Sequence, residues 1–336
     1  MPNQMLPEPT DAEWQRLYQA ALQFQEQAPW TRLTDADLFA VERPETGDAI
    51  YCAVMGAAGL EYGLLACRGA RGLLAYLLMA NDALDSDEAV LVQDSLSLTF
   101  GDRSDSDEAD RAVHAALSLR FRGRGAWPVF RSHRPHYLPS HLRQGEASFL
   151  ATCLEQTCLL AHEIGSGLLL QEPPGDNEVF VRRQNEQGNW ETTAMSLPSP
   201  TLDMAIDERR LNSIVGNYER IAQSWEVRLL AVVPIAGEDD GQDFWGRILL
   251  CVDHKTGFVW PTGVLGPNER VQDAFLAALE SAGFVPKTLR LTSGLLEAQL
   301  SPIAQVLGIE VRRVAELPEL EAASASLMSA LPRIRR

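Results

Sequence analysis

The sequence RILLCVDHKTGFVWPTGVLG, at residues 247–266, decides the fold of the second half of the chain. Its apolar run predicts a buried strand, and Lys255–Thr256–Gly257 predicts a turn into another strand. Apolar segments on either side predict three further strands. The five expected strands are Val227–Val233, Ile248–Val252, Phe258–Leu265, Thr288–Thr292 and Glu310–Val314.

Helical patterns alternate with the later strands of this half. We expect helices over 207–223, 268–282 and 319–328, and a helix over 294–308 that is interrupted or bent at Pro302. Three strands in a meander, followed by helix, strand, helix, strand and helix, predict a mixed sheet flanked by helices.

The first half predicts an α+β domain. Thr10 and Glu13 have the spacing of a capping box before a helix that runs to Leu22. Strands are expected over 37–42, 49–56, 61–69 and 89–100, helices over 69–79, 110–119 and 144–164, and a hairpin over 178–197. The segment 121–141 contains three prolines and two glycines, which predicts an ordered loop.

Length and composition limit the class of protein. At 336 residues we expect two domains, 1–198 and 199–336. The net charge of −17 argues against general nucleic-acid binding, because phosphate contacts require a basic surface. We expect a cytoplasmic protein, because the N-terminus lacks a signal-peptide pattern, no apolar run reaches membrane-spanning length, and the five cysteines include no C-x-x-C pair.

The segment Arg247–Met328 resembles the core domain of retroviral-type integrases and transposases. The resemblance is carried by LLCVDHKTGFV, by Pro286–Leu291, and by LGIEVRRV followed by a proline and a helix. The whole chain resembles an uncharacterised bacterial two-domain family with a P-x-F-R-S-x-x-P loop, here Pro128–Pro135. This resemblance implies an α/β fold class, with a ribonuclease H-like mixed sheet in the second domain.

The integrase pattern also implies a set of catalytic carboxylates, since two-metal phosphoryl transfer needs several acids around the cations. Here Glu226 is expected at the beginning of the first strand, with no acid in its middle, and Ser293 replaces the second acid. Glu319 or Glu321 could match the third acid, and Asp253 corresponds to an aspartate that is usually structural. We therefore expect a catalytically degenerate domain, a pseudoenzyme.

An arginine-rich loop at residues 120–143 is the candidate binding surface. Residues 111–145 contain seven arginines and no acid, and guanidinium groups suit carboxylates and phosphates. Alternatively, these arginines pair with acids of the first domain or with the Glu238–Asp239–Asp240 turn. A metal site of His133, His136 and His141 is not favoured, because prolines break the segment. The candidate residues are Arg122, Arg124, Arg131, His133, Arg134, His136 and Arg143.

Two functions remain open at this point. The favoured hypothesis is a non-catalytic binding or adaptor protein, with no cofactor, that engages an unidentified anionic ligand or protein partner. The alternative is a metal-dependent nuclease or phosphotransferase that uses rearranged carboxylates, Asp253, Glu297 and Glu319. The sequence has no nucleophile elbow, Walker A loop or dinucleotide-binding fingerprint, so other common enzyme classes have no support.

Overall fold

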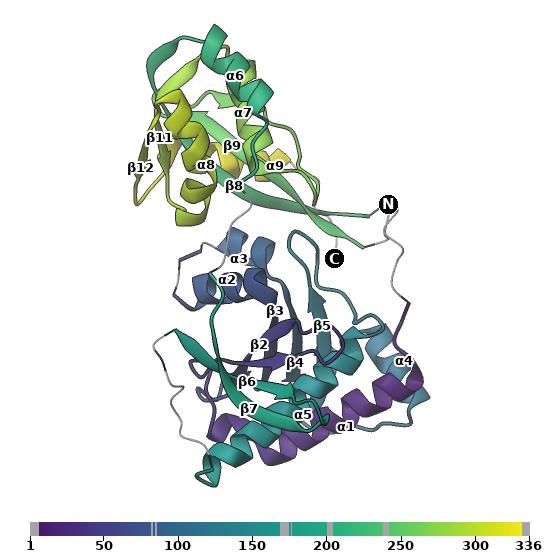
Figure 1. The fold of residues 1–336 in the computed structure, drawn as a ribbon. Coiled ribbons are helices and arrows are strands. Elements are labelled where there is room, and N and C mark those ends of the chain that lie inside the picture. The colour runs from purple at the N-terminus through teal and green to yellow at the C-terminus, as the bar shows by residue number, and fades with distance from the viewer. Residues whose placement is uncertain are drawn as a thin grey trace. The chain divides into compact units, whose positions relative to one another are not determined.

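The computed structural model describes residues 7–81, 83–84, 86–168, 175, 177–199, 204–237 and 242–330. The chain forms two compact units, each with one sheet (Figure 1). The first unit comprises Met1–Tyr76, Gln93–Arg134 and Pro139–Pro200. The second comprises Leu77–Val92, Pro135–Leu138 and Thr201–Arg336, so two short segments from the first half of the chain belong to it.

A seven-stranded sheet of order β5-β4-β3-β2-β1-β6-β7 forms the first unit. Only β1 and β6 pair in parallel among these neighbours, so the sheet is mixed. Its strands are β1 Phe39–Glu42, β2 Ala49–Met55, β3 Gly63–Arg68, β4 Ser95–Gly101, β5 Trp127–His133, β6 Glu178–Gln184 and β7 Trp190–Ser196. The main helices around it are α1 Asp11–Gln27, α2 Gly69–Ala80, α4 Glu108–Ala116 and α5 Glu146–Gly165, with short 3₁₀ turns at Pro29–Thr31 and Arg103–Asp105.

Helices α1 and α5 lie together against this sheet (Figure 1). The capping box predicted for α1 is confirmed, since the Thr10 side chain accepts the Glu13 N–H and Glu13 bonds back to the Thr10 N–H. Buried residues of both helices, among them Phe24 and Leu150, share one core with the inner face of the sheet. Burial of that apolar surface stabilises the layer arrangement.

Two predictions for the first half of the chain differ from the structure. The segment 121–141, predicted as a loop, contains the regular strand β5. This strand lies at the edge of the sheet, where a proline is tolerated because its missing N–H does not have to pair with a second neighbouring strand. The strand predicted over 89–100 is confirmed only from Ser95 onward, as β4, because its first residues belong to helix α3, Ser86–Val92. The run Val90–Val92 is short and apolar, and such a run does not distinguish strand from helix by periodicity.

The second unit contains a five-stranded mixed sheet of order β10-β9-β8-β11-β12. Strands β10, β9 and β8 are antiparallel neighbours, whereas β11 runs parallel to both β8 and β12. Its strands are β8 Arg220–Ile235, β9 Phe244–Asp253, β10 Val259–Trp260, β11 Val285–Leu291 and β12 Glu310–Arg313, and its later helices are α6 Glu208–Asn217, α7 Val271–Ala282, α8 Gly294–Leu307 and α9 Pro318–Ala330. All five predicted strand segments therefore contribute to one sheet, as expected.

Helices cover both faces of this sheet (Figure 1). Odd-numbered residues such as Trp225, Val227 and Leu249 pack with α3, α6, α7 and α8. Even-numbered residues such as Leu230 and Val252 pack under α9. The alternation follows from the two-residue period of a strand, and it separates the sheet into two faces of different chemistry.

Two boundaries in this unit, and the effect of one proline, differ from prediction. The helix expected over 207–223 ends at Asn217, because the following residues pair in parallel with β11 from Arg220 onward. Strand β10 has only two residues, since Pro261 and Gly263 (φ +78°) follow it, and Leu265 returns as an isolated bridge to Arg247. Pro302 lies inside α8 and does not interrupt it.

The structure confirms the coarse prediction of a mixed α/β protein with two mixed sheets flanked by helices. All five cysteines are free and buried. Within the described ranges, no helix is both long and apolar enough to cross a membrane.

A core substitution tests the packing of the second unit. Phe275 is fully buried in α7 against Trp225. We expect Phe275→Ala to lower the free energy of unfolding of this unit by about 3–5 kcal/mol, because it loses apolar contacts and leaves a cavity. Urea denaturation measures the loss, and Val264→Ala, at a 53% exposed position, is the matched control. Equal stability of the two variants would contradict the packing described.

Candidate functional site

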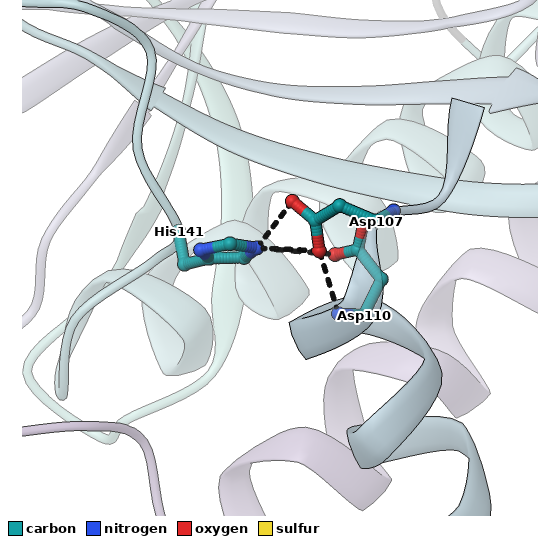
Figure 2. A group of neighbouring side chains, drawn as sticks. All are labelled: Asp107, Asp110 and His141. Atoms are coloured by element: carbon teal, nitrogen blue, oxygen red, sulfur yellow. Dashed lines mark hydrogen bonds and ion pairs between the residues drawn. The ribbon is translucent and has the colours of Figure 1, made fainter. Parts of the chain in front are cut away.

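Two carboxylates and one imidazole of the first unit lie together at the start of α4 (Figure 2). Asp107 is the N-cap of α4 and accepts the Asp110 N–H at 2.9 Å. The Nε2 atom of His141 lies 2.9 Å from Asp107 Oδ2 and 3.7 Å from Asp110 Oδ1. Helix capping therefore brings two acids of one turn beside a histidine that follows β5.

Arg131 of β5 joins this cluster as its permanent cation. Its Nη1 and Nη2 atoms donate to the two oxygens of Asp110 at 3.0 and 2.8 Å, and Nη2 donates to Asp107 at 3.1 Å. Burial lowers the pKa of Arg131, but the Asp110 and Asp107 carboxylates outweigh burial and raise it. Burial raises the pKa of Asp107, whereas the Asp110 N–H, His141 and Arg131 together lower it below its usual value. The arrangement is thus an ion-pair network.

The donor types of Asp107, Asp110 and His141 also suit a small cation. Their ligand atoms lie within 4.8 Å of one another, and no other group of three such side chains does so among the residues that the structure describes. However, both oxygens of Asp110 already accept from Arg131. A metal ion would therefore meet a guanidinium at the same carboxylate, and like charges repel at that distance. Charge balance favours the ion-pair network over a metal centre.

His133, at the end of β5, belongs to a different network. Arg68 donates to the His133 carbonyl oxygen at 2.7 Å and pairs with Glu146 at 2.6 Å. The His133 ring lies 3.2 Å from Ser97 Oγ. Burial, together with the positive charges of Arg68 and Arg131, lowers the pKa of His133 to about 4. His133 is therefore neutral at physiological pH and is a poor candidate for anion binding.

Three arginines of the predicted loop extend into solvent. Arg120, Arg122 and Arg124 are exposed, and the Arg124 side chain reaches 96% exposure beside Asp102 at 3.7 Å. Phe121 points inward between them and stacks with Tyr18 at 6.0 Å. This alternation anchors the segment through one aromatic ring and leaves its guanidinium groups accessible. Among the candidate arginines and histidines, those in the segment Arg120–Arg124 are the most exposed to solvent.

The other candidate residues lie apart from one another. Arg143 is half-buried, and its backbone N–H bonds Glu146. Arg134 is half-buried in the first unit. His136 belongs to the second unit, where its Nε2 lies 3.4 Å from Arg247 Nη1. The predicted residues therefore do not form one binding site, and the Glu238–Asp240 turn lies outside the described residues.

Glu226 is the buried acid of the second unit. It was expected at the beginning of its strand, but β8 begins at Arg220, so Glu226 lies well inside it and is fully buried. Its oxygens contact His254 Nδ1 at 2.6 Å and accept the Leu320 N–H of α9 at 2.8 Å. The His254 side chain is 32% exposed. The carboxylate thus holds a helix end and a histidine, and both of its oxygens are engaged.

The three acids of the alternative enzyme hypothesis lie in separate local structures. Asp253 Oδ1 accepts the Lys255 and Thr256 N–H groups and the Thr256 hydroxyl, so it shapes the turn after β9. Glu297 is half-buried on α8, and Glu319 is half-buried beside Gly257. They do not form a group of three acids within metal-binding distance among the described residues.

Ser293, between β11 and α8, caps α8 by accepting the Leu296 N–H, and it donates to Glu88. Glu88 is buried and comes from α3 of the first half of the chain. Sequence reasoning missed Glu88, Asp107, Asp110 and His254. The spacing Asp107-x-x-Asp110 before a helix was a usable capping signal, but Glu88 is far from Ser293 in sequence and gave no signal.

The family model of the domain of unknown function DUF7309 matches residues 14–182, and that of the domain of unknown function DUF6930 matches residues 210–328. No curated protein and no solved structure matches the chain.

The Arg131 network predicts a stability effect. Arg131→Ala leaves the Asp110 carboxylate, only 7% exposed, without its cation. We expect the first unit to lose about 3 kcal/mol of unfolding free energy, because an unpaired buried charge is costly. Chemical denaturation measures this, with Arg124→Ala as the control of nearly unchanged stability. A loss for Arg131→Ala no larger than the control would exclude the network as a stabilising element.

His133 predicts a pH effect. The pKa of His133 is about 4 in the folded chain, below the ordinary value of 6.5. Between these two pH values the unfolded chain therefore binds a proton at His133 that the folded chain does not bind. Stability is fully present above pH 6.5 and falls by about 3 kcal/mol as the pH drops through 6.5 toward 4. Urea denaturation across this range should show a smaller loss for His133→Gln than for the exposed control His162→Gln. Identical pH profiles would refute the assignment.

Proposed function

The chain belongs to the family of the domain of unknown function DUF7309, and from this premise we propose that it is a non-catalytic binding protein. Its two domains, 1–198 and 199–336, would act as binding scaffolds, with a ribonuclease H-like second domain. The order β10-β9-β8-β11-β12, an antiparallel meander followed by two parallel strands, supports this relation. The helices between the later strands and α9 after them support it further.

The observation that carries the proposal is how the second unit uses its polar side chains. Both oxygens of Glu226 are engaged, by His254 and by the Leu320 N–H, and one oxygen of Asp253 is engaged by its own turn. Ser293, between β11 and α8, is engaged as the cap of α8. Two-metal hydrolysis needs acids that converge on cations about 4 Å apart. The engaged acids support binding over hydrolysis.

The exposed Arg120–Arg124 segment is the surface that we propose for an anionic partner. Its guanidinium groups stand in solvent in a protein of net charge −17, where they attract anions locally. Arg131 and His133 are excluded from this surface, because they are engaged inside the first unit. Exposed pairs give weak individual contributions, so recognition would depend on several arginines acting together.

Catalysis is tested directly. The purified chain is incubated with single-stranded, duplex and RNA–DNA hybrid substrates in Mg²⁺ or Mn²⁺, and we expect no cleavage above the buffer control. Glu208→Ala, on the exposed start of α6, is the control for contaminating nuclease. Cleavage that persists in this control but disappears in Asp253→Ala or Glu319→Ala would overturn the proposal and favour a metal-dependent enzyme.

Anion binding is tested with a fluorescent polyglutamate peptide. We expect Arg122→Ala/Arg124→Ala to weaken binding roughly tenfold and to leave unfolding stability nearly unchanged. Binding of the unmodified chain should also weaken as salt rises, since exposed charges are screened over about 10 Å at 0.1 M. The matched control is Arg71→Ala/Arg209→Ala, which also removes two positive charges but lies outside the Arg120–Arg124 segment. Equal binding by the two double variants would count against the segment.

A further inference from the structure

The α9 face of the second sheet carries a cluster of arginines. Glu226 and Arg228 alternate with Leu230 on β8, and Leu230 packs under α9. Side chains two residues apart share a face of a strand. Arg228 therefore lies on the same face as α9.

The strand register brings two more arginines beside it. On β11, Arg290 is the partner of Glu226, and on β12, Arg312 is the partner of Arg290. Partners in register project to the same face. Arg228 is one pleat beyond Glu226, so Arg228 and Arg290 are diagonal neighbours, roughly 5–8 Å apart at Cβ. Arginines this close repel one another unless a negative charge lies near them.

The protein supplies little of that negative charge. Arg312 pairs with Glu310 at 2.9 Å, and Glu226 is engaged by His254 and the Leu320 N–H. The Nε atoms of Arg228 and Arg290 are buried and have no hydrogen-bond partner in the described part of the chain. Neither side chain forms an ion pair with a described residue. Glu226 lies in register with Arg290, but neither Arg228 nor Arg290 forms an ion pair with it, so both guanidinium groups keep unused hydrogen-bonding capacity.

The cluster is accessible despite its position on the sheet. On this face α9 packs on β8 and β9 (Figure 1). Arg228 and Arg290 are half-buried, and Arg312 is exposed. A small anion can therefore reach the guanidinium groups from solvent, while their Nε atoms remain shielded from water.

We propose that Arg228 and Arg290 bind a phosphate group of a small molecule, with Arg312 at the rim of the site. A carboxylate offers two oxygens, which satisfy one guanidinium fork, whereas a phosphate offers enough oxygens for forks from two strands. The half-buried position strengthens such charge-assisted hydrogen bonds. This site goes beyond the proposed function, because it lies in the other unit from the Arg120–Arg124 segment and depends on different residues.

The test measures binding of inorganic phosphate, pyrophosphate and adenosine monophosphate to the full chain by calorimetry and thermal shift, with chloride at constant ionic strength. We expect saturable binding near one molecule per chain. Arg228→Met and Arg290→Met should each weaken it at least about tenfold, because one charge-assisted fork is lost. Without phosphate, both variants should melt at or above the temperature of the unmodified chain, since each removes a half-buried charge that forms no ion pair.

Controls separate this site from other cationic surfaces. Arg209→Met removes an exposed charge on α6, and Arg122→Ala/Arg124→Ala removes the other candidate surface; both should retain phosphate binding. Preference for inorganic phosphate or for adenosine monophosphate distinguishes a free anion from a nucleotide. Absence of binding by all three probes, undiminished binding in Arg290→Met, or an equal response to acetate would each overturn the proposal. If phosphate binding were lost only in Arg122→Ala/Arg124→Ala, the phosphate site would be assigned to the first unit.

Discussion

The Glu226 carboxylate is the contact on which the architecture of the second unit depends. One buried group joins three elements, because it lies on β8, contacts His254 after β9 and accepts the Leu320 N–H at the start of α9. A helix N-terminus favours a negative charge, and a buried carboxylate requires hydrogen-bond donors, so each satisfies the other. This contact fixes the start of α9, and α9 in turn determines how much of the sheet face stays open.

The arginines of this chain occupy three kinds of environment, and these environments organise its chemistry. Arg131 and Arg68 are engaged by buried or half-buried acids of the first unit. Arg122 and Arg124 stand in solvent. Arg228 is half-buried with no acidic partner in the described chain. Paired arginines stabilise the fold, exposed ones attract anions weakly and over a distance, and half-buried unpartnered ones have unmet hydrogen-bonding capacity that a specific ligand can satisfy.

Local sequence patterns predicted most helices and strands. The features that they failed to predict depend on contacts between segments that are distant in the sequence. The capping box at Thr10 and the apolar run Ile248–Val252 depend on near neighbours, and both predictions were confirmed. The start of β8 depends on pairing with β11 far along the chain, so the position of Glu226 within its strand was mistaken. The arginine-rich loop was recognised from composition, but composition cannot reveal which guanidinium meets Asp110. Only the fold separates Arg131 from Arg122.

The charges on the α9 face bear on the phosphate site that we propose there. A catalytic two-metal site places cations among carboxylates that attract them. On this face Arg290 lies in register with Glu226, Arg228 lies two residues further along β8, and the Glu226 carboxylate is already engaged. A divalent cation about 4 Å from a single guanidinium would be repelled by about 8 kcal/mol at an effective dielectric constant near 20. The same positive charges attract an anion, which supports the phosphate site that we propose on this face.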